Sequence, residues 1–171
     1  RLIQSALAAA VLGASGLAAA PARSGGTLRA GLGGAHRSDS WDSRTHSDFF
    51  MIAAAQGAVF DTLTEVAADG SLRGELATGW EASPDARVWT VTLREGVRFH
   101  NGKPFVAEDV LASLKLHLDP AAASGARPLV ESIATMERLS DHRVRFTLEA
   151  GNADFPYLLA DYHLLIYPAG Q

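Results

Sequence analysis

The sequence predicts an α+β fold in which antiparallel strand pairs are combined with a few helices. Residues 88–93 alternate between apolar and polar side chains, which is the two-residue period of a strand, and residues 143–149 repeat this pattern. Apolar residues between positions 110 and 118 instead recur at helical spacing. Turn residues separate neighbouring strand candidates, so local hairpins are expected.

In the first half of the chain, capping and turn signals divide the expected elements. Ser47 is positioned to cap a helix, and Asp69-Gly70 is a hairpin turn signal. The expected elements, in order, are a strand at 27–32, a helix over 49–60, an extended stretch at 61–66 and a returning strand at 72–80.

The second half of the chain begins with the strand at 88–93, which Glu95-Gly96 interrupts and residues 97–100 resume. Asn101-Gly102 is a strong tight-turn signal because both residues tolerate a positive φ. The following helix has two acids in its first turn, where the helix dipole favours them. The remaining expected elements are a loop at 121–128, a weak strand at 130–138, a strand at 143–149, a short helix at 155–160 and a last strand at 164–167.

The first 22 residues have the pattern of a secretory signal peptide. Arg1 precedes an apolar, alanine-rich run over residues 7–20, and Ala20-Pro21-Ala22 fits a cleavage site of small residues. The run is too short and too weakly apolar for a good membrane span. A buried alanine-rich helix is the alternative interpretation. We therefore expect a mature chain that starts near residue 23.

Composition argues against several functional classes. The chain has 171 residues and a net charge of −4 without a basic stripe, so nucleic acid is not an expected partner. The absence of cysteine excludes disulfides, thiolate metal sites and cysteine catalysis in this chain. Six histidines are scattered without the spacing of a metal pair, and we find no phosphate-binding glycine loop. We expect no enzyme activity, no cofactor and no metal site.

The most informative stretch is residues 80–110, WEASPDARVWTVTLREGVRFHNGKPFVAEDV. It resembles the signature region of the family 5 extracellular solute-binding proteins, which are the peptide- and nickel-type receptors of ABC importers. The resemblance extends from about residue 25 to residue 168. Val106 departs from it, because the family usually has Thr or Ser there as a helix cap. Losing that acceptor weakens the start of the helix by about 1 kcal/mol.

The resemblance implies a two-lobed, type II periplasmic-binding-protein-like fold, of which this chain holds one part. In such receptors the first strand belongs to a large lobe, and the chain then forms an inserted small lobe. This plan assigns residues 23–46 to the first strand and turn of the large lobe, 47–168 to the small α+β lobe, and 169–171 to the start of the return. Half of a cleft cannot close around a solute, so we expect these residues alone to bind ligand weakly or not at all.

Two short segments are the expected ligand contacts. One follows a turn that matches the family's turn before its peptide-lining residues, and the other stands where the chain turns back toward the large lobe. A tyrosine flanked by an acid and a histidine could stack on a ligand and pair its charged ends. The alternative is that the aromatic residues belong to the core and the polar ones to loop surface. The first segment is His46, Ser47, Asp48 and Phe49, and the second is Asp161, Tyr162 and His163.

The resemblance implies a solute-binding subunit that captures a short peptide and delivers it to the permease subunits of an ABC importer. A metal-chelate receptor of the nickel type is the alternative within the family. A secreted enzyme or a sensor on the same fold is a further alternative. We expect a monomer in the periplasm, without a lipid anchor because there is no cysteine to carry one.

Overall fold

The computed structural model describes residues 25–27 and 29–170, so the signal peptide expected at residues 1–22 lies outside the described residues. Residues up to 31 and residues 32–170 form separate units, and only the second carries helices and strands among its described residues. The strand expected at 27–32 is therefore wrong for the described part of that stretch. A strand requires a neighbour for its backbone donors and acceptors, and the described residues of this stretch pair with none.

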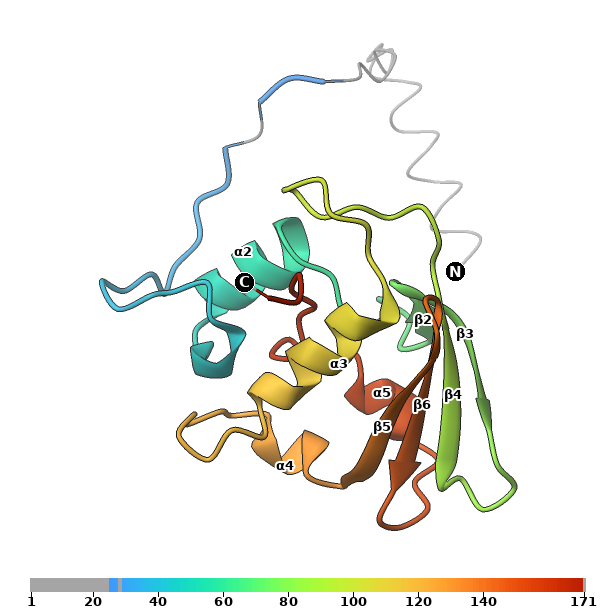
Figure 1. Ribbon diagram of the computed structural model, residues 1–171. Coiled ribbons are helices and arrows are strands. Elements are labelled where there is room, and N and C mark those ends of the chain that lie inside the picture. Colours follow the sequence, from blue (N-terminus) through green and yellow to red (C-terminus); the bar gives the residue numbers. More distant parts are fainter. Residues whose placement is uncertain (1–24, 28, 171) are drawn as a thin grey trace, which may run out of the picture. The chain divides into compact units, whose positions relative to one another are not determined.

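A four-stranded antiparallel sheet organises residues 32–170 (Figure 1). Its strands, in spatial order, are β3 (Ala77–Ala82), β4 (Val88–Leu93), β6 (Arg143–Leu148) and β5 (Ile133–Ser140). The strands β4 and β6 are distant in sequence but pair directly, with Val91 opposite Val144. The α+β class predicted from the sequence is confirmed.

The sheet buries one face, as the two-residue period predicts. On β4, Trp89, Val91 and Leu93 are buried, while the residues between them are half-buried or exposed. The same alternation on β6 buries its three apolar side chains. The opposite face of the sheet carries threonine and charged side chains, so only one side requires a cover.

Helices supply that cover (Figure 1). The helices α3 (Ala107–Leu116) and α5 (Phe155–Leu158) lie against the apolar face, whereas α4 (Arg127–Val130) precedes β5. The expected spacing on α3 is confirmed, because its apolar side chains at 110, 111 and 114 are buried. Val106 offers no side-chain acceptor at the start of α3. Asp109 instead accepts the Val106 N–H at 2.9 Å, which is one half of a capping box.

A second, two-stranded sheet joins β1 (Thr64–Val66) to β2 (Leu72–Gly74). The predicted turn at Asp69-Gly70 connects them, with Gly70 at a φ of 81°. The turn predicted at Asn101-Gly102 is also present. The strand expected at 97–100 is reduced to a single bridge between Arg98 and Pro104, since proline has no N–H to extend a ladder.

Three further details of the fold differ from the predictions. The helix α2 (Phe49–Ala58) begins where expected, but its cap is Asp48 and not Ser47. The loop expected at 121–128 runs into α4. The last strand expected at 164–167 is wrong, because its backbone groups bond outside any ladder. Ile166 donates to the Asp61 carbonyl at 3.1 Å, and Tyr167 donates to the Ser113 hydroxyl at 2.9 Å.

Candidate functional site

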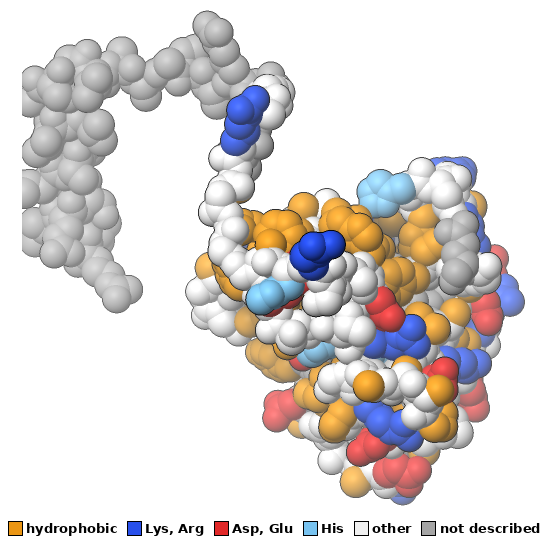
Figure 2. Space-filling model, turned by 90° about the vertical axis from the view of Figure 1, so that its left-hand side faces the viewer, with side chains coloured by type: hydrophobic (Ala, Val, Ile, Leu, Met, Phe, Trp, Pro, Cys, Tyr) orange, Lys and Arg blue, Asp and Glu red, His pale blue; other side chains and the backbone are white. Residues whose placement is uncertain are grey.

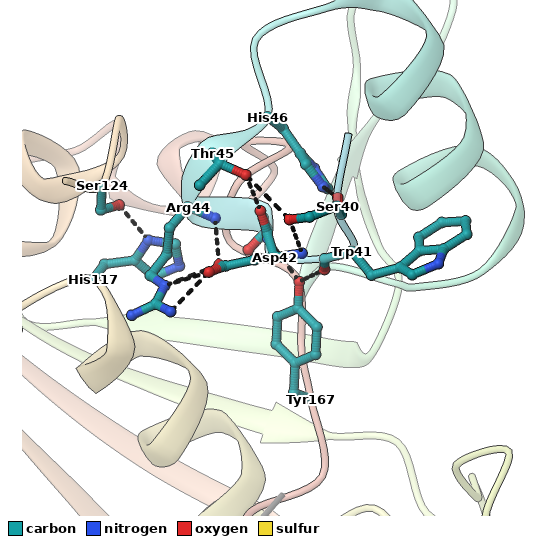
Figure 3. Close-up of polar contacts among 10 residues, drawn as sticks. Ser40, Trp41, Asp42, Arg44, Thr45, His46, His117, Ser124 and Tyr167 are labelled. Atoms are coloured by element: carbon teal, nitrogen blue, oxygen red, sulfur yellow. Dashed lines mark hydrogen bonds and ion pairs between the residues drawn. The ribbon is translucent and has the colours of Figure 1, made fainter. Parts of the chain in front are cut away.

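The segment of residues 40–46 lies at the centre of the candidate site (Figure 3). Asp42 caps the short 3₁₀ turn η1 (Ser43–Thr45) by accepting the Arg44 N–H at 3.1 Å. The Arg44 guanidinium also donates to the same carboxylate, through Nε at 2.9 Å and Nη2 at 2.7 Å. These side-chain hydrogen bonds hold the pKa of Asp42 below its usual range. The two opposite charges are therefore fixed at the surface in one geometry.

Tyr167 ties the end of the described chain to this segment (Figure 3). Its hydroxyl donates to the Trp41 carbonyl at 2.8 Å and accepts the Ser43 N–H at 3.0 Å. Burial raises the pKa of Tyr167, so the hydroxyl stays protonated and can make both bonds. The ring packs against Phe60, with ring centroids 4.9 Å apart.

Three buried histidines lie within or beside the same segment. The ring of His46 reaches the Ser40 carbonyl at 3.1 Å through Nε2. The His117 Nδ1 atom lies 2.6 Å from the Ser124 hydroxyl, and His163 Nε2 lies 3.0 Å from the His46 carbonyl. Burial, followed by the nearby His163, lowers the pKa of His117 to about 4. His117 is therefore neutral at physiological pH.

The first predicted ligand segment divides between structural and exposed positions. His46 is buried at 3% exposure, and Asp48 caps α2 by accepting the Met51 N–H at 2.9 Å. Ser47 is exposed, and Phe49 is 64% exposed on the first turn of α2. Ser47 and Phe49 are therefore the exposed side chains of this segment.

The second predicted segment lies directly against the first. His163 is buried, and its Nδ1 lies 2.7 Å from Asp161 Oδ1. The ring of Tyr162 stacks beside it, with centroids 4.0 Å apart. The contact between His163 and the His46 carbonyl joins the two segments, which are 117 positions apart in sequence.

An apolar groove of about 530 Å³ opens beside residues 42–44. Its walls include Phe60, Val97, Phe99, Leu116 and Ile166, and the Asp42–Arg44 pair also lines it. Figure 2 shows the molecule from the α2 side, where hydrophobic side chains gather in the upper part and charged ones below. The groove has the size and the apolar lining of a ligand pocket or a covered interface.

A smaller hollow of about 250 Å³ is lined by the same pair. It is lined by Asp42, Arg44, Thr45, Asp119 and residues 121–123. The Asp42–Arg44 pair therefore presents both signs of charge to two hollows at once. This arrangement suits a ligand that carries an apolar body and charged ends.

The described residues, 25–27 and 29–170, contain neither a candidate metal cluster nor a candidate membrane-spanning helix. Within these ranges, no group of three or more histidine, aspartate or glutamate side chains is placed to hold a metal ion. No helix in the same ranges has the length and hydropathy needed to cross a membrane.

The family model of the bacterial extracellular solute-binding proteins, family 5 (middle region), matches residues 71–169. This match covers more than half of the chain. The chain belongs to this family. Members of the family are periplasmic or extracellular transport receptors that bind solutes.

Two curated relatives show the range of this family. The chain is 34% identical to di/tripeptide-binding protein 1 of Pseudomonas aeruginosa over 179 aligned positions, which cover 93% of this chain and 33% of that protein. It is 36% identical to the nickel-binding periplasmic protein of Escherichia coli over 104 positions, which cover 61% of this chain and 20% of that protein. The chain thus spans a fifth to a third of the length of these relatives.

A solved family member has the same fold in the matched region. This is the periplasmic binding protein DppA of Helicobacter pylori in complex with the peptide STSA, with a TM-score of 0.67 and 30% identity. The match covers 77% of this chain and 29% of that one. The predicted family and its periplasmic-binding-protein-like fold are confirmed, with this chain as one part of a two-lobed architecture.

Several residues that build the site are not among those predicted from the sequence. Asp42 and Arg44 stand two positions apart in the sequence, which was a usable signal for a capped, charged pair. His117 follows the last residue of α3, and Tyr167 lies after α5. Both are distant from residues 40–46 in sequence, and only the folding of the chain brings them to the site. No local pattern marks them.

Proposed function

We propose that this chain is part of a solute-binding subunit of an ABC importer, and that its solute is a short peptide. The observation that carries the proposal is the family match over residues 71–169. The site geometry agrees with it. Residues 46–49 and 161–163 meet beside a charged pair and two hollows, as one wall of a ligand cleft would require.

In this proposal the lobes follow the plan of the family. Residues 23–46 belong to a large lobe, residues 47–168 form an inserted small lobe, and residues 169–171 begin the return. The exposed Phe49 and the half-buried Tyr162 contact the peptide, while Arg44 and Asp161 pair with its charged ends. The cleft closes when a second lobe meets this wall, which excludes water from the bound peptide.

The proposed receptor works in the periplasm as a monomer and presents its loaded form to membrane permease subunits. It performs no chemistry on the solute and requires no cofactor. A peptide recovered unchanged from the complex supports this role. Cleavage of the peptide on repeated turnover would instead assign the protein to the secreted enzymes.

A nickel-type chelate is the second candidate solute. The 36% identity to the nickel-binding periplasmic protein favours it. The two candidates make opposite predictions about metal. Peptide binding proceeds in the presence of a chelator, whereas chelate binding requires the metal ion.

Titration calorimetry on the protein as produced from its own gene decides between them. The ligands are a panel of di- and tripeptides with EDTA present, and Ni²⁺ with and without free histidine. Heat with peptides in EDTA supports the peptide proposal, and heat that depends on nickel supports the chelate. Absence of heat with all of these ligands contradicts both.

A pair of variants then tests the position of the site. Phe49→Ala removes an exposed aromatic ring from the predicted segment, and Tyr157→Ala removes one from α5, where 46% of the residue is exposed. Loss of a stacked aromatic contact is expected to weaken peptide binding about tenfold or more for Phe49→Ala. Tyr157→Ala should bind as the unmodified protein does. Equal effects would place the ligand elsewhere.

A further inference from the structure

The ring of His163 contacts an oxygen acceptor through each of its two nitrogens. Nδ1 lies 2.7 Å from Asp161 Oδ1, and Nε2 lies 3.0 Å from the His46 carbonyl oxygen. The ring is buried, with 8% of the residue exposed, so water does not compete freely for either contact.

Both partners can only accept a proton in these contacts. A backbone carbonyl has no proton to give. Asp161 Oδ1 already accepts the backbone N–H of His163 at 2.9 Å, which marks it as an acceptor oxygen. A neutral imidazole carries one N–H and can donate from one nitrogen only, while an imidazolium donates from both. Only the doubly protonated ring satisfies both contacts.

We propose that His163 is held as an imidazolium and is a positioning residue, which fastens residues 40–46 to residues 161–163. This inference rests on the proposed function, because these are the two segments assigned to the ligand. It assigns His163 to the support of the cleft wall and not to direct contact with the solute.

The neighbouring groups are consistent with a single positive charge in this histidine cluster. His46 points Nε2 at the Ser40 carbonyl, so its proton is on Nε2, and its buried Nδ1 has no hydrogen-bond partner in the described structure. Burial, with the nearby His163 as the second cause, lowers the pKa of His117 to about 4, so that ring is neutral. The charged groups that face this cluster are Asp161, Asp42 and Arg44. Asp161 is the carboxylate that neutralises His163.

The loop before α4 is shaped around the same ring. A Cβ atom added to Gly125 would lie 2.9 Å from His163 Nε2, and the Gly125 N–H donates to the Arg44 carbonyl at 3.3 Å. The glycine therefore allows the loop to approach both the ring and residues 40–46. A side chain there would push the ring away from the His46 carbonyl.

The charge state is tested by NMR on the protein labelled with ¹⁵N at its histidines. We expect two bonded N–H protons on the His163 ring, with both nitrogens at imidazolium shifts. The Asp161→Asn variant, which removes the neutralising charge, should lose one of these protons. A native His163 ring with one protonated and one unprotonated nitrogen would overturn the proposal. This measurement requires no ligand.

The positioning role is tested with two substitutions that each keep one of the bonds. The amide of His163→Gln reaches the place of Nε2 and can still donate to the His46 carbonyl, while that of His163→Asn reaches only the place of Nδ1. Loss of the bond to His46 is expected to reduce the hydrogen-exchange protection of residues 40–46 about tenfold in His163→Asn and by less than about threefold in His163→Gln. Equal losses in both variants, or no loss in either, would overturn the role.

Two glycine variants give an independent measurement in case the histidine variants do not fold. Gly125→Ala should reduce protection of residues 40–46, while Gly57→Ala, whose Cβ meets nothing within 4 Å, should not. Tri-alanine binding by the unmodified protein is measured in parallel. Failure to bind it counts against the proposed function, whereas the proton count and the exchange data decide the role of His163.

Discussion

The sheet and the site face of this protein are stabilised by different kinds of interaction. In the sheet, β4 and β6 form five consecutive residue pairs, and alternate side chains of both strands are buried. The site face consists of residues 40–46 and 161–169, and none of these residues belongs to a strand. The sheet therefore depends on backbone ladders and apolar burial, whereas the site face has no backbone ladder to stabilise it.

The site face is held by side chains that bond to backbone groups far away in sequence. Tyr167 bonds to Trp41 and Ser43, and His163 bonds to the His46 carbonyl. Asp109 accepts the Ala169 N–H at 2.7 Å. Each bond also satisfies a backbone group that has no ladder partner. Losing one of these side chains thus leaves a buried donor or acceptor unpaired, which is the costlier kind of loss.

Asp109→Ala should give the largest loss of stability in this comparison. The carboxylate is fully buried and accepts the Val106 and Ala169 N–H groups, and Lys103 pairs with it. Its removal leaves two backbone donors and an ammonium group without their partner, so we expect a loss of about 4 kcal/mol in the free energy of unfolding. Urea unfolding measures it.

Glu108→Ala is the matched control for that loss. Glu108 is the exposed acid beside Asp109 in the first turn of α3. Its removal should cost less than about 1 kcal/mol, which is the range of a dipole contact at the surface. If both variants lost the same stability, the site face would not depend on side-chain bonds of this kind.

Acid should weaken the site face through His117. The folded state lowers the pKa of this ring to about 4 from its usual 6.5, so the unfolded chain binds the proton more tightly. Stability is therefore complete above pH 6.5 and is lost as the pH falls toward 4. The shift corresponds to about 3 kcal/mol for this buried group. Urea unfolding at a series of pH values between 7 and 4 measures this loss in the free energy of unfolding.

His117→Asn separates this loss from the general effect of acid. The asparagine amide occupies the place of Nδ1 beside Ser124 but does not titrate in this range. The variant should lose less stability between pH 6.5 and pH 4 than the unmodified protein. Identical pH dependence in the two proteins would show that His117 is not the group that titrates.

Phe146→Leu should affect the sheet less than Asp109→Ala affects the site face. Phe146 is fully buried and packs against Phe155, with ring centroids 5.4 Å apart. Leucine fills part of the space and leaves the ladder to β4 intact, so a loss of about 1–2 kcal/mol is expected. A loss above that of Asp109→Ala, measured in the same urea series, would reverse the comparison between the two regions.

The same difference explains how much the sequence could predict. Strands β4 and β6, the hairpin turn at Asp69-Gly70 and helix α3 all follow from periodicity and turn chemistry, which are local signals. The strand expected at 164–167 is wrong because an apolar run fits both a strand and a buried irregular segment. The choice between a strand and an irregular segment is made by the Ser113 hydroxyl and the Asp61 carbonyl, which are far away in the chain and accept the backbone N–H groups of this run.

The candidate site was predictable only in part for the same reason. The sequence drew attention to residues 46–49 and 161–163, and the fold places these two segments in contact. It could not indicate that His46 and His163 are buried, because burial depends on segments distant in sequence, such as the α3–α4 loop whose Gly125 lies against the His163 ring. Asp42 and Arg44 gain their importance from the hollows beside them, and hollows are a property of the assembled fold.

Arg44→Gln should have the smallest effect on stability and should separate folding from binding. The guanidinium is 29% exposed and the Asp42 carboxylate is 37% exposed, so solvent screens the pair and its loss should cost less than about 1 kcal/mol. The turn itself survives, because the backbone N–H of residue 44 still donates to Asp42. The pKa of Asp42 should rise toward its ordinary value, since the donating guanidinium is gone.

A carboxyl titration by NMR and a peptide titration check these outcomes. Each is compared with the Arg73→Gln variant, which changes an exposed residue of strand β2. Arg73→Gln should leave the pKa of Asp42, the stability and the binding unchanged. Weaker peptide binding by Arg44→Gln at nearly full stability would assign the charged pair to the solute. A loss of several kcal/mol in the free energy of unfolding would instead show that Arg44 stabilises the fold. The sheet and the site face would then differ less in what stabilises them than their hydrogen bonds suggest.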